Sequence, residues 1–247
     1  MFAARLKDVM DGKADPVYQD ANVFFNNTYP TAGLKTLLRE VLGRLTGQMP
    51  SSNPIIRLET SFGGGKTHNL IALYHAANGE VEPRLLRTYL DDEWPLPRAG
   101  KIDVAGVVGS DLDPSTGMAH PEDDLKTYTL WGELAYQIGG RSGYELARES
   151  DQNKVAPGTG LFEQVIGERP TLIMIDEIAR HLRAAVATPT ATGRSNLSAQ
   201  TVAFLMSLME YVASQKNVVL VLTMAGPEDA FAQETNDEEI HTIQNDA

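Results

Sequence analysis

The sequence predicts an α/β fold of three layers, in which a mainly parallel sheet lies between helices. Apolar runs typical of buried strands alternate along the chain with stretches of helical periodicity. The runs are apolar throughout instead of alternating with polar residues, which indicates strands that are covered on both faces. Strands are therefore expected at residues 55–58, 102–108, 172–177 and 218–223.

Helices are expected between these strands and before the first one. Thr31 is typical of an N-cap, and Leu and Val residues at helical spacing follow it until Gly47 ends the helix. Further helices are predicted at residues 66–78, 121–138 and 197–215, the second of them with Glu122, Asp123 and Asp124 in its first turn. We divide the chain into an N-terminal linker with an amphipathic helix, residues 1–50, and a core, residues 51–247.

Composition excludes several classes of protein. The formal net charge is −12 and no run of Lys and Arg occurs, which disfavours direct binding of nucleic acid. The absence of cysteine excludes disulfides and thiolate metal sites, and the five histidines have no ligand-like spacing. The start of the chain lacks a signal-peptide core and no apolar stretch is long enough to span a bilayer, so we expect a cytoplasmic protein without a membrane anchor.

A glycine-rich loop between the first strand and the following helix has the composition of a phosphate-binding loop. Its residues are Ser61, Phe62, Gly63, Gly64, Gly65, Lys66, Thr67 and His68. Glycines let the backbone approach phosphates closely, and the helix N-terminus presents N–H groups to them. Lys66 is expected to reach the β- and γ-phosphates of a nucleotide, and the Thr67 hydroxyl to bind Mg²⁺. Thr60 stands where this motif usually has a glycine, so the loop entry differs.

The third strand ends in two carboxylates, Asp176 and Glu177. Successive side chains of a strand point to opposite faces, so the two acids have different roles. Asp176 is expected to bind Mg²⁺, and Glu177 to orient and polarise an attacking water. The carboxyl end of a buried parallel strand is where α/β sheets bind their ligands.

Thr223 is a third candidate, at the end of the fourth strand. If that strand lies between the first and the third, this hydroxyl lies between the terminal phosphate and the water that Glu177 holds. A strand-end threonine favoured by β propensity is the alternative interpretation. Because no Asn-Lys-x-Asp guanine signature occurs, ATP is the expected nucleotide.

At these residues the chain resembles an AAA+ or AAA-like ATPase of the additional-strand class, with a P-loop NTPase fold. In that class a strand and a helix separate the phosphate loop from the acidic pair. The chain also resembles the N-terminal ATPase part of large prokaryotic ATPases of domain-of-unknown-function family 499, whose members often occur in anti-phage defence clusters. The matching stretches are residues 24–38, the loop at 62–68, Thr129-Leu130-Trp131-Gly132-Glu133, and Ile175-Asp176-Glu177.

The resemblance also implies parts that this sequence lacks. AAA+ modules continue into a fifth strand, an arginine finger and a helical lid, whereas residues 224–247 contain no arginine. We therefore expect a fold without the C-terminal helical lid, in a fragment of a longer protein or a truncated module. Arg194, or an arginine from a partner subunit in a homo-oligomer or larger multisubunit assembly, is a hypothetical arginine finger.

Three functions compete on this basis. The first is an ATPase that couples hydrolysis to conformational change in a larger complex. The second is a regulatory module that binds ATP without significant turnover. The third, a phosphoryl transferase of the kinase type, ranks last because Glu177 beside Asp176 favours activation of water over a substrate hydroxyl.

Overall fold

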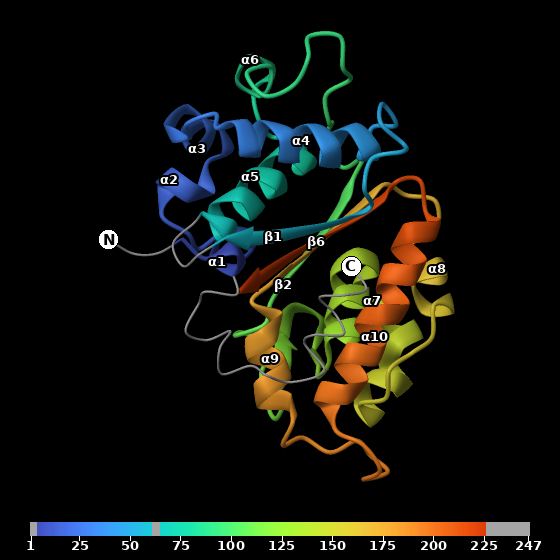
Figure 1. Cartoon of the computed structure of the whole chain (residues 1–247). Coiled ribbons are helices and arrows are strands. Elements are labelled where there is room, and N and C mark those ends of the chain that lie inside the picture. The colour runs from blue at the N-terminus through green and yellow to red at the C-terminus, as the bar shows by residue number, and fades with distance from the viewer. Residues whose placement is uncertain (1–3, 61–64, 226–247) are drawn as a thin grey trace.

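The computed structural model describes residues 4–60 and 65–225 (Figure 1). Its main sheet has four parallel strands in the order β1-β6-β5-β2. Their bounds are β1 (Ile55–Thr60), β2 (Asp103–Val108), β5 (Thr171–Asp176) and β6 (Val218–Ala225). The predicted parallel α/β sheet is therefore confirmed, and the last strand lies between the first and the third as the argument for Thr223 requires. Thr60 ends β1.

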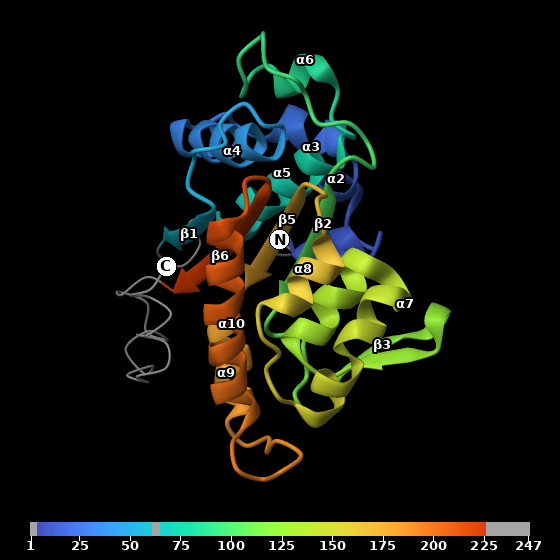
Figure 2. The same cartoon turned by 90° about the vertical axis from the view of Figure 1, so that its right-hand side faces the viewer.

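Helices cover both faces of this sheet, and Figures 1 and 2 show the two groups on opposite sides. One face carries α1 (Leu6–Met10), α3 (Ala21–Asn27), α4 (Ala32–Leu45) and α5 (Lys66–Asn78). The other carries α7 (Leu130–Asn153), α8 (Gly160–Ile166), α9 (Ile178–Ala185) and α10 (Leu197–Ser214). The described part of the chain thus forms three layers.

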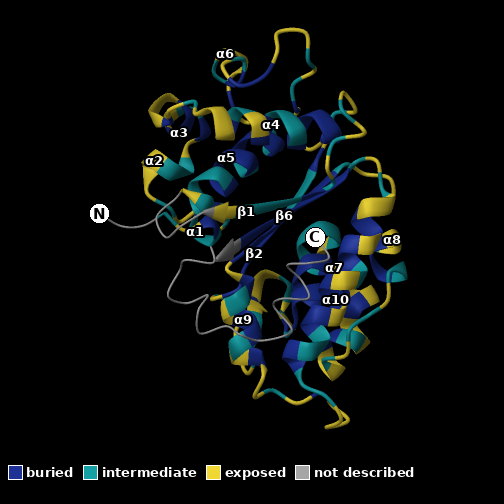
Figure 3. Cartoon of the chain, in the orientation of Figure 1, coloured by how far each residue is buried: buried dark blue, intermediate teal, exposed yellow. Residues whose placement is uncertain are grey.

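Alternate residues of each strand belong to the two apolar cores. In β5, Leu172 and Met174 pack among the N-terminal helices, whereas Ile173 and Ile175 pack among α7 to α10. All four side chains are inaccessible to solvent, and Figure 3 shows β6 as buried, whereas the edge strand β1 is partly exposed. This burial on both faces is the physical reason why the inner strands β5 and β6 are almost entirely apolar.

Two regions have a local structure that differs from the expectation. In the stretch expected to be a linker, three helices precede the first predicted one: α1, α2 (Pro16–Gln19) and α3. Asp15 caps α2 through Val17 N, and Asp20 caps α3 through Asn22 N and Val23 N. These caps satisfy N–H groups that such short helices leave unpaired.

The helix expected at residue 121 begins at Leu130 instead. Before it, β3 (Met118–His120) and β4 (Leu125–Thr127) form an antiparallel hairpin around a single 3₁₀ turn, Pro121–Asp123. Thr129 is the N-cap of α7 and accepts a hydrogen bond from Gly132 N. The three acids therefore lie in a hairpin turn instead of a first helical turn, and Asp124 has a left-handed backbone, with φ 48°.

The remaining elements complete the frame. A short helix, α6 (Pro83–Leu86), lies in the connection between α5 and β2. The helix α7 has a kink at Gly140, where φ is 61° and ψ is −153°, and it continues to Asn153 instead of ending at the predicted residue 138. Arg44 of α4 is buried, and its guanidinium donates to four carbonyl oxygens, of Pro50, Ser52, Gln215 and Val218. These bonds tie α4 to the start of β6.

Candidate functional site

The predicted phosphate loop joins the carboxyl end of β1 to the N-terminus of α5. Ser61, Phe62, Gly63 and Gly64 lie outside the described residues. Gly65 is the N-cap of α5 and has a left-handed backbone, with φ 78°. This conformation costs free energy for any residue with a side chain, but not for glycine. Lys66 begins α5 and is partly exposed. The described end of the loop is therefore a glycine turn that leads into a helix N-terminus, a suitable geometry for binding anions.

Thr67 and Asp176 come together although they are far apart in the sequence. The Thr67 hydroxyl donates a hydrogen bond of 3.2 Å to Asp176 Oδ2. Asp176 ends β5 and is almost fully buried, with 4% of its surface exposed. Because both groups present oxygen atoms, the pair offers the hard ligands that Mg²⁺ prefers.

Thr223 of β6 connects both members of the acidic pair, Asp176 and Glu177. Its hydroxyl donates to Asp176 Oδ1 at 2.5 Å and accepts from the backbone N–H of Glu177 at 3.0 Å. The side chain is buried, with 2% of its surface exposed. Asp176 thus receives one hydroxyl donor from each flanking element, α5 and β6, and its carboxylate is held in one orientation.

Glu177 differs from Asp176 in its backbone conformation, its exposure to solvent and its partner. It lies just beyond β5 as the N-cap of α9, with φ 53° and ψ 37°. A left-handed backbone is uncommon for a residue with a side chain and costs on the order of 1 kcal/mol. Its carboxylate is 43% exposed and forms an ion pair of 3.3 Å with Arg180, one turn further along α9. The turn therefore directs Glu177 to solvent while Asp176 stays buried.

Gly109, which sequence reasoning missed, packs against the backbone of the acidic pair. Its N–H donates to the Asp176 carbonyl at 2.7 Å, which continues the β2–β5 ladder by one bond. A Cβ on Gly109 would lie 2.5 Å from the Glu177 carbonyl oxygen, so only glycine fits without a backbone shift. The signal was present in the sequence as a glycine directly after an apolar strand.

His68 faces away from the acidic pair, towards α3. Its Nε2 lies 3.0 Å from Thr28 Oγ1, and its ring packs on Phe24 at 4.5 Å between centroids. Since the Thr28 hydroxyl donates to Phe24 O, it accepts from His68 Nε2. Burial lowers the pKa of His68. The contacts therefore give this predicted loop residue a packing role between α5 and α3.

Arg194 is exposed in the loop between α9 and α10. Within residues 4–60 and 65–225, no three His, Asp or Glu side chains form a metal-binding group. The same residues contain no helix that is long and apolar enough to cross a membrane.

The fold and this cluster define a parallel α/β protein with a polar site at the carboxyl edge of its sheet. A sequence profile described as the DUF499 N-terminal domain matches residues 1–245. The chain belongs to this family. Searches of curated proteins and of solved structures gave no match.

Proposed function

We propose that this chain binds ATP together with Mg²⁺ and hydrolyses it, as a P-loop ATPase of the AAA+-like, additional-strand type. The observation that carries the proposal is the convergence of Thr67, Asp176 and Thr223 from α5, β5 and β6 at one edge of the sheet. The interposed β2 and α7, which separate the glycine loop from the acidic pair in the sequence, support the additional-strand type.

The residues present fit Mg²⁺ bound with a nucleotide. Such an ion takes one or two protein oxygens and completes its shell with phosphate oxygens and water. Thr67 and Asp176 supply those two oxygens, which lie 3.2 Å apart. When bound, the ion neutralises negative charge on the phosphate oxygens.

The remaining chemistry belongs to the side chains around this pair. Lys66, at the N-terminus of α5, binds terminal phosphate oxygens. Glu177 orients the attacking water and accepts its proton, for which its exposed carboxylate is suited. Thr223 positions the acidic pair through its two hydrogen bonds. In this mechanism Lys66, Thr67 and Asp176 hold the nucleotide, and the exposed Glu177 activates water.

The decisive experiment measures binding and turnover separately. A fluorescent ATP analogue with Mg²⁺ is titrated into the wild-type chain, Lys66→Ala, and Lys101→Ala as a control at an exposed lysine. We expect binding by the wild type and the control, and none by Lys66→Ala. Glu177→Gln is expected to bind normally and to lose about 10²–10⁴-fold in turnover. Failure of the wild type to bind would refute the proposal.

A second function, nucleotide binding without significant turnover, is favoured by one observation. The carboxylate that should activate water is paired with Arg180. If this ion pair persists with nucleotide bound, Glu177 cannot accept a proton efficiently and the chain acts as a switch. Unchanged, near-zero phosphate release in both the wild type and Glu177→Gln, with intact binding, would support this alternative. In either case we propose that nucleotide state changes the conformation of a larger assembly; a defence role is proposed from family context alone.

A further inference from the structure

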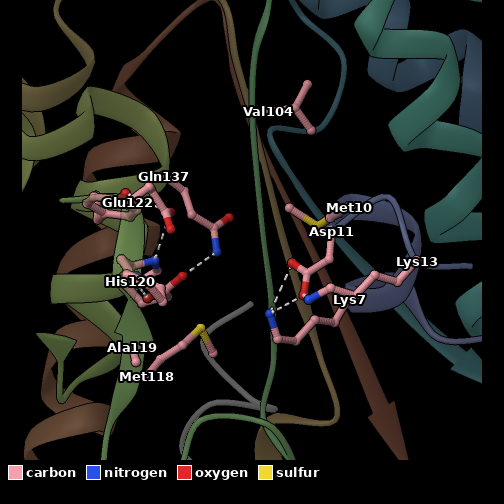
Figure 4. A pocket seen from close by; sticks show the side chains of 13 residues that line it. Lys7, Met10, Asp11, Lys13, Val104, Met118, Ala119, His120, Glu122 and Gln137 are labelled. Atoms are coloured by element: carbon pink, nitrogen blue, oxygen red, sulfur yellow. Dashed lines mark hydrogen bonds and ion pairs between the residues drawn. The ribbon is translucent and has the colours of Figure 1, made fainter. Parts of the chain in front are cut away.

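A polar cavity of about 490 Å³ lies beside the free edge of β2, away from the acidic pair. Figure 4 shows Lys7, Asp11 and Lys13 on one side of it and His120 and Glu122 on the other. The first wall belongs to α1 and the residues after it, and the second to the β3–β4 hairpin and α7. Its volume lies in the range of about 300–1,000 Å³ that is usual for small-molecule sites.

Glu133 fixes the orientation of the histidine in this cavity. Its carboxylate is 1% exposed and accepts from His120 Nε2 at 2.8 Å, Thr127 Oγ1 at 2.6 Å and Gln137 Nε2 at 2.7 Å. Burial alone would raise the pKa of Glu133, but the bonds from these three donors outweigh it, and the pKa is lowered. Glu133 is therefore ionised at neutral pH, so His120 Nε2 is the protonated nitrogen that donates to it.

The other ring nitrogen of His120 is left for a ligand. Its Nδ1 lies 4.0 Å from Glu122 Oε1, which is beyond hydrogen-bond distance, and it makes no hydrogen bond within the described part of the chain. A ligand hydroxyl can pair with this nitrogen, because a hydroxyl group both donates and accepts hydrogen bonds. Tyr136 packs against the ring, with 3.9 Å between centroids, and keeps it in place. His120, which lines the cavity, thus offers a ring nitrogen whose orientation Glu133 fixes.

The opposite wall is cationic. Lys7 Nζ contacts Asp11 Oδ2 at 2.9 Å, and Lys13 Nζ contacts the same oxygen at 3.3 Å. Two ammonium groups share one carboxylate, which leaves an excess of one positive charge there. Each ammonium carries three N–H donors, so donors remain for an anion. Glu122 and Glu133 line the other side of the cavity, so an oxyanion is expected only at the side of the lysines.

Contacts with Gly106 of β2, at the base of the cavity, connect both walls to the same strand. Gln137 donates to Gly106 O at 3.0 Å and accepts from Gly106 N at 2.8 Å, so its amide replaces a neighbouring strand at the edge of β2. Met10 of α1 packs directly over Gly106, where a Cβ would lie 2.7 Å from its sulfur. The network around Glu133 therefore has a structural role as well, but that role needs neither lysine nor Nδ1.

We propose that this cavity is a second binding site, for a small molecule that carries an oxyanion at one end and a hydroxyl group at the other. The oxyanion binds Lys7 and Lys13, and the hydroxyl forms a hydrogen bond with His120 Nδ1. A phosphate monoester and a carboxylate share this chemistry, so both belong to the proposal. The site is independent of the proposed nucleotide site, since it shares no residue with the acidic pair or the glycine loop.

The test uses three small probes of one carbon skeleton. Glycerol 3-phosphate and glycerate carry both groups, whereas glycerol lacks the oxyanion. Titrations follow the His120 ring signal by NMR, assigned as the histidine signal lost in His120→Gln, and the heat of binding by calorimetry. All proteins carry Lys66→Ala, so that the proposed nucleotide site does not contribute. We expect a saturable change with one or both anionic probes, with a dissociation constant on the order of 1 mM, and none with glycerol.

Matched lysine variants decide the outcome. The double variant Lys7→Met with Lys13→Met should weaken binding roughly tenfold or more, because it removes the charge-assisted bonds. Lys35→Met with Lys101→Met, on other surfaces, should leave binding unchanged. Absence of a saturable signal with both anionic probes would overturn the proposal, and so would equal binding by the two double variants. The calorimetric comparison holds even if His120→Gln does not fold.

Discussion

Replacement of Thr223 by Val tests the geometry of the candidate site most directly. The two side chains have nearly the same shape, so the change removes the hydroxyl and little else. It leaves Asp176 Oδ1 without its 2.5 Å donor and the Glu177 N–H without its 3.0 Å acceptor. A hydrogen bond to a charged group contributes about 1.5–3 kcal/mol and a neutral one about 1 kcal/mol. We therefore expect a loss of about 3 kcal/mol in the free energy of unfolding.

Urea unfolding followed by circular dichroism measures this loss, and thermal unfolding gives a second reading. For a chain of this length about 3 kcal/mol corresponds to a decrease of roughly 6–12 °C in Tm. Thr223→Ser keeps the hydroxyl and should lose only about 1 kcal/mol, from the missing methyl group. It should also retain any ATP turnover, whereas Thr223→Val should lose most of it.

Thr201 of α10 supplies a matched control. It is as buried as Thr223, but its hydroxyl donates at 2.8 Å to Leu197 O, one turn earlier in the same helix. Because no charged group depends on this bond, Thr201→Val should cost less than about 1 kcal/mol. If Thr223→Val is no more destabilising than Thr201→Val, the proposed linkage of Thr223 to the acidic pair is refuted.

Three other predictions concern the frame around the site. Gly109→Ala should lower the free energy of unfolding by about 2 kcal/mol, because its Cβ would lie 2.5 Å from a backbone carbonyl oxygen. The control Gly33→Ala, whose Cβ would have no neighbour within 4 Å, should be neutral or stabilising, and similar urea midpoints for the two variants would contradict the prediction. Burial lowers the pKa of His75 and His181 from 6.5, so these side chains take up protons in the unfolded chain before they do so in the folded one. The free energy of unfolding should therefore fall as the pH is lowered through 6.5, and equal urea midpoints at pH 7.5 and 5.5 would refute this prediction. Arg44→Met should lower the free energy of unfolding, measured with urea, by about 3–5 kcal/mol, because four carbonyl oxygens lose a buried cationic donor. A loss below about 1 kcal/mol would show that water replaces the guanidinium and would contradict the prediction.

The sheet was predictable because its strands satisfy one strong condition. Burial on both faces demands continuous apolar runs, and these are visible without any knowledge of the fold. The parallel arrangement then brings strand ends to one edge, which is why Asp176 and Thr223 could be expected near the loop that contains Thr67. Their hydrogen-bond partners could not be derived, because they depend on the register β5–β6 and on the pitch of α5.

The errors arose where short-range polar contacts decide the structure. The helices α2 and α3 are too short for a periodic signal, although Asp15 before Pro16 and Asp20 before Ala21 are positions at which an aspartate can cap a helix. The acids at 122–124 resemble a helix start, but the hairpin prevails because Thr129 caps α7. His120 and Glu133 come from different elements, so their pairing is a property of the folded chain.

Under the proposed function, the arrangement of the acidic pair separates nucleotide binding from turnover. Asp176 is buried and held by the hydroxyls of Thr67 and Thr223, so its orientation is set by the fold itself. Glu177 lies next to it on a left-handed turn, exposed, and its partner Arg180 is itself 54% exposed. An ion pair between such exposed groups contributes only about 0–1 kcal/mol, so a bound phosphate or a neighbouring subunit can displace it with little cost. Under the proposed function, release of Glu177 from Arg180 is therefore the point at which we expect an assembly to control hydrolysis without affecting the affinity for nucleotide.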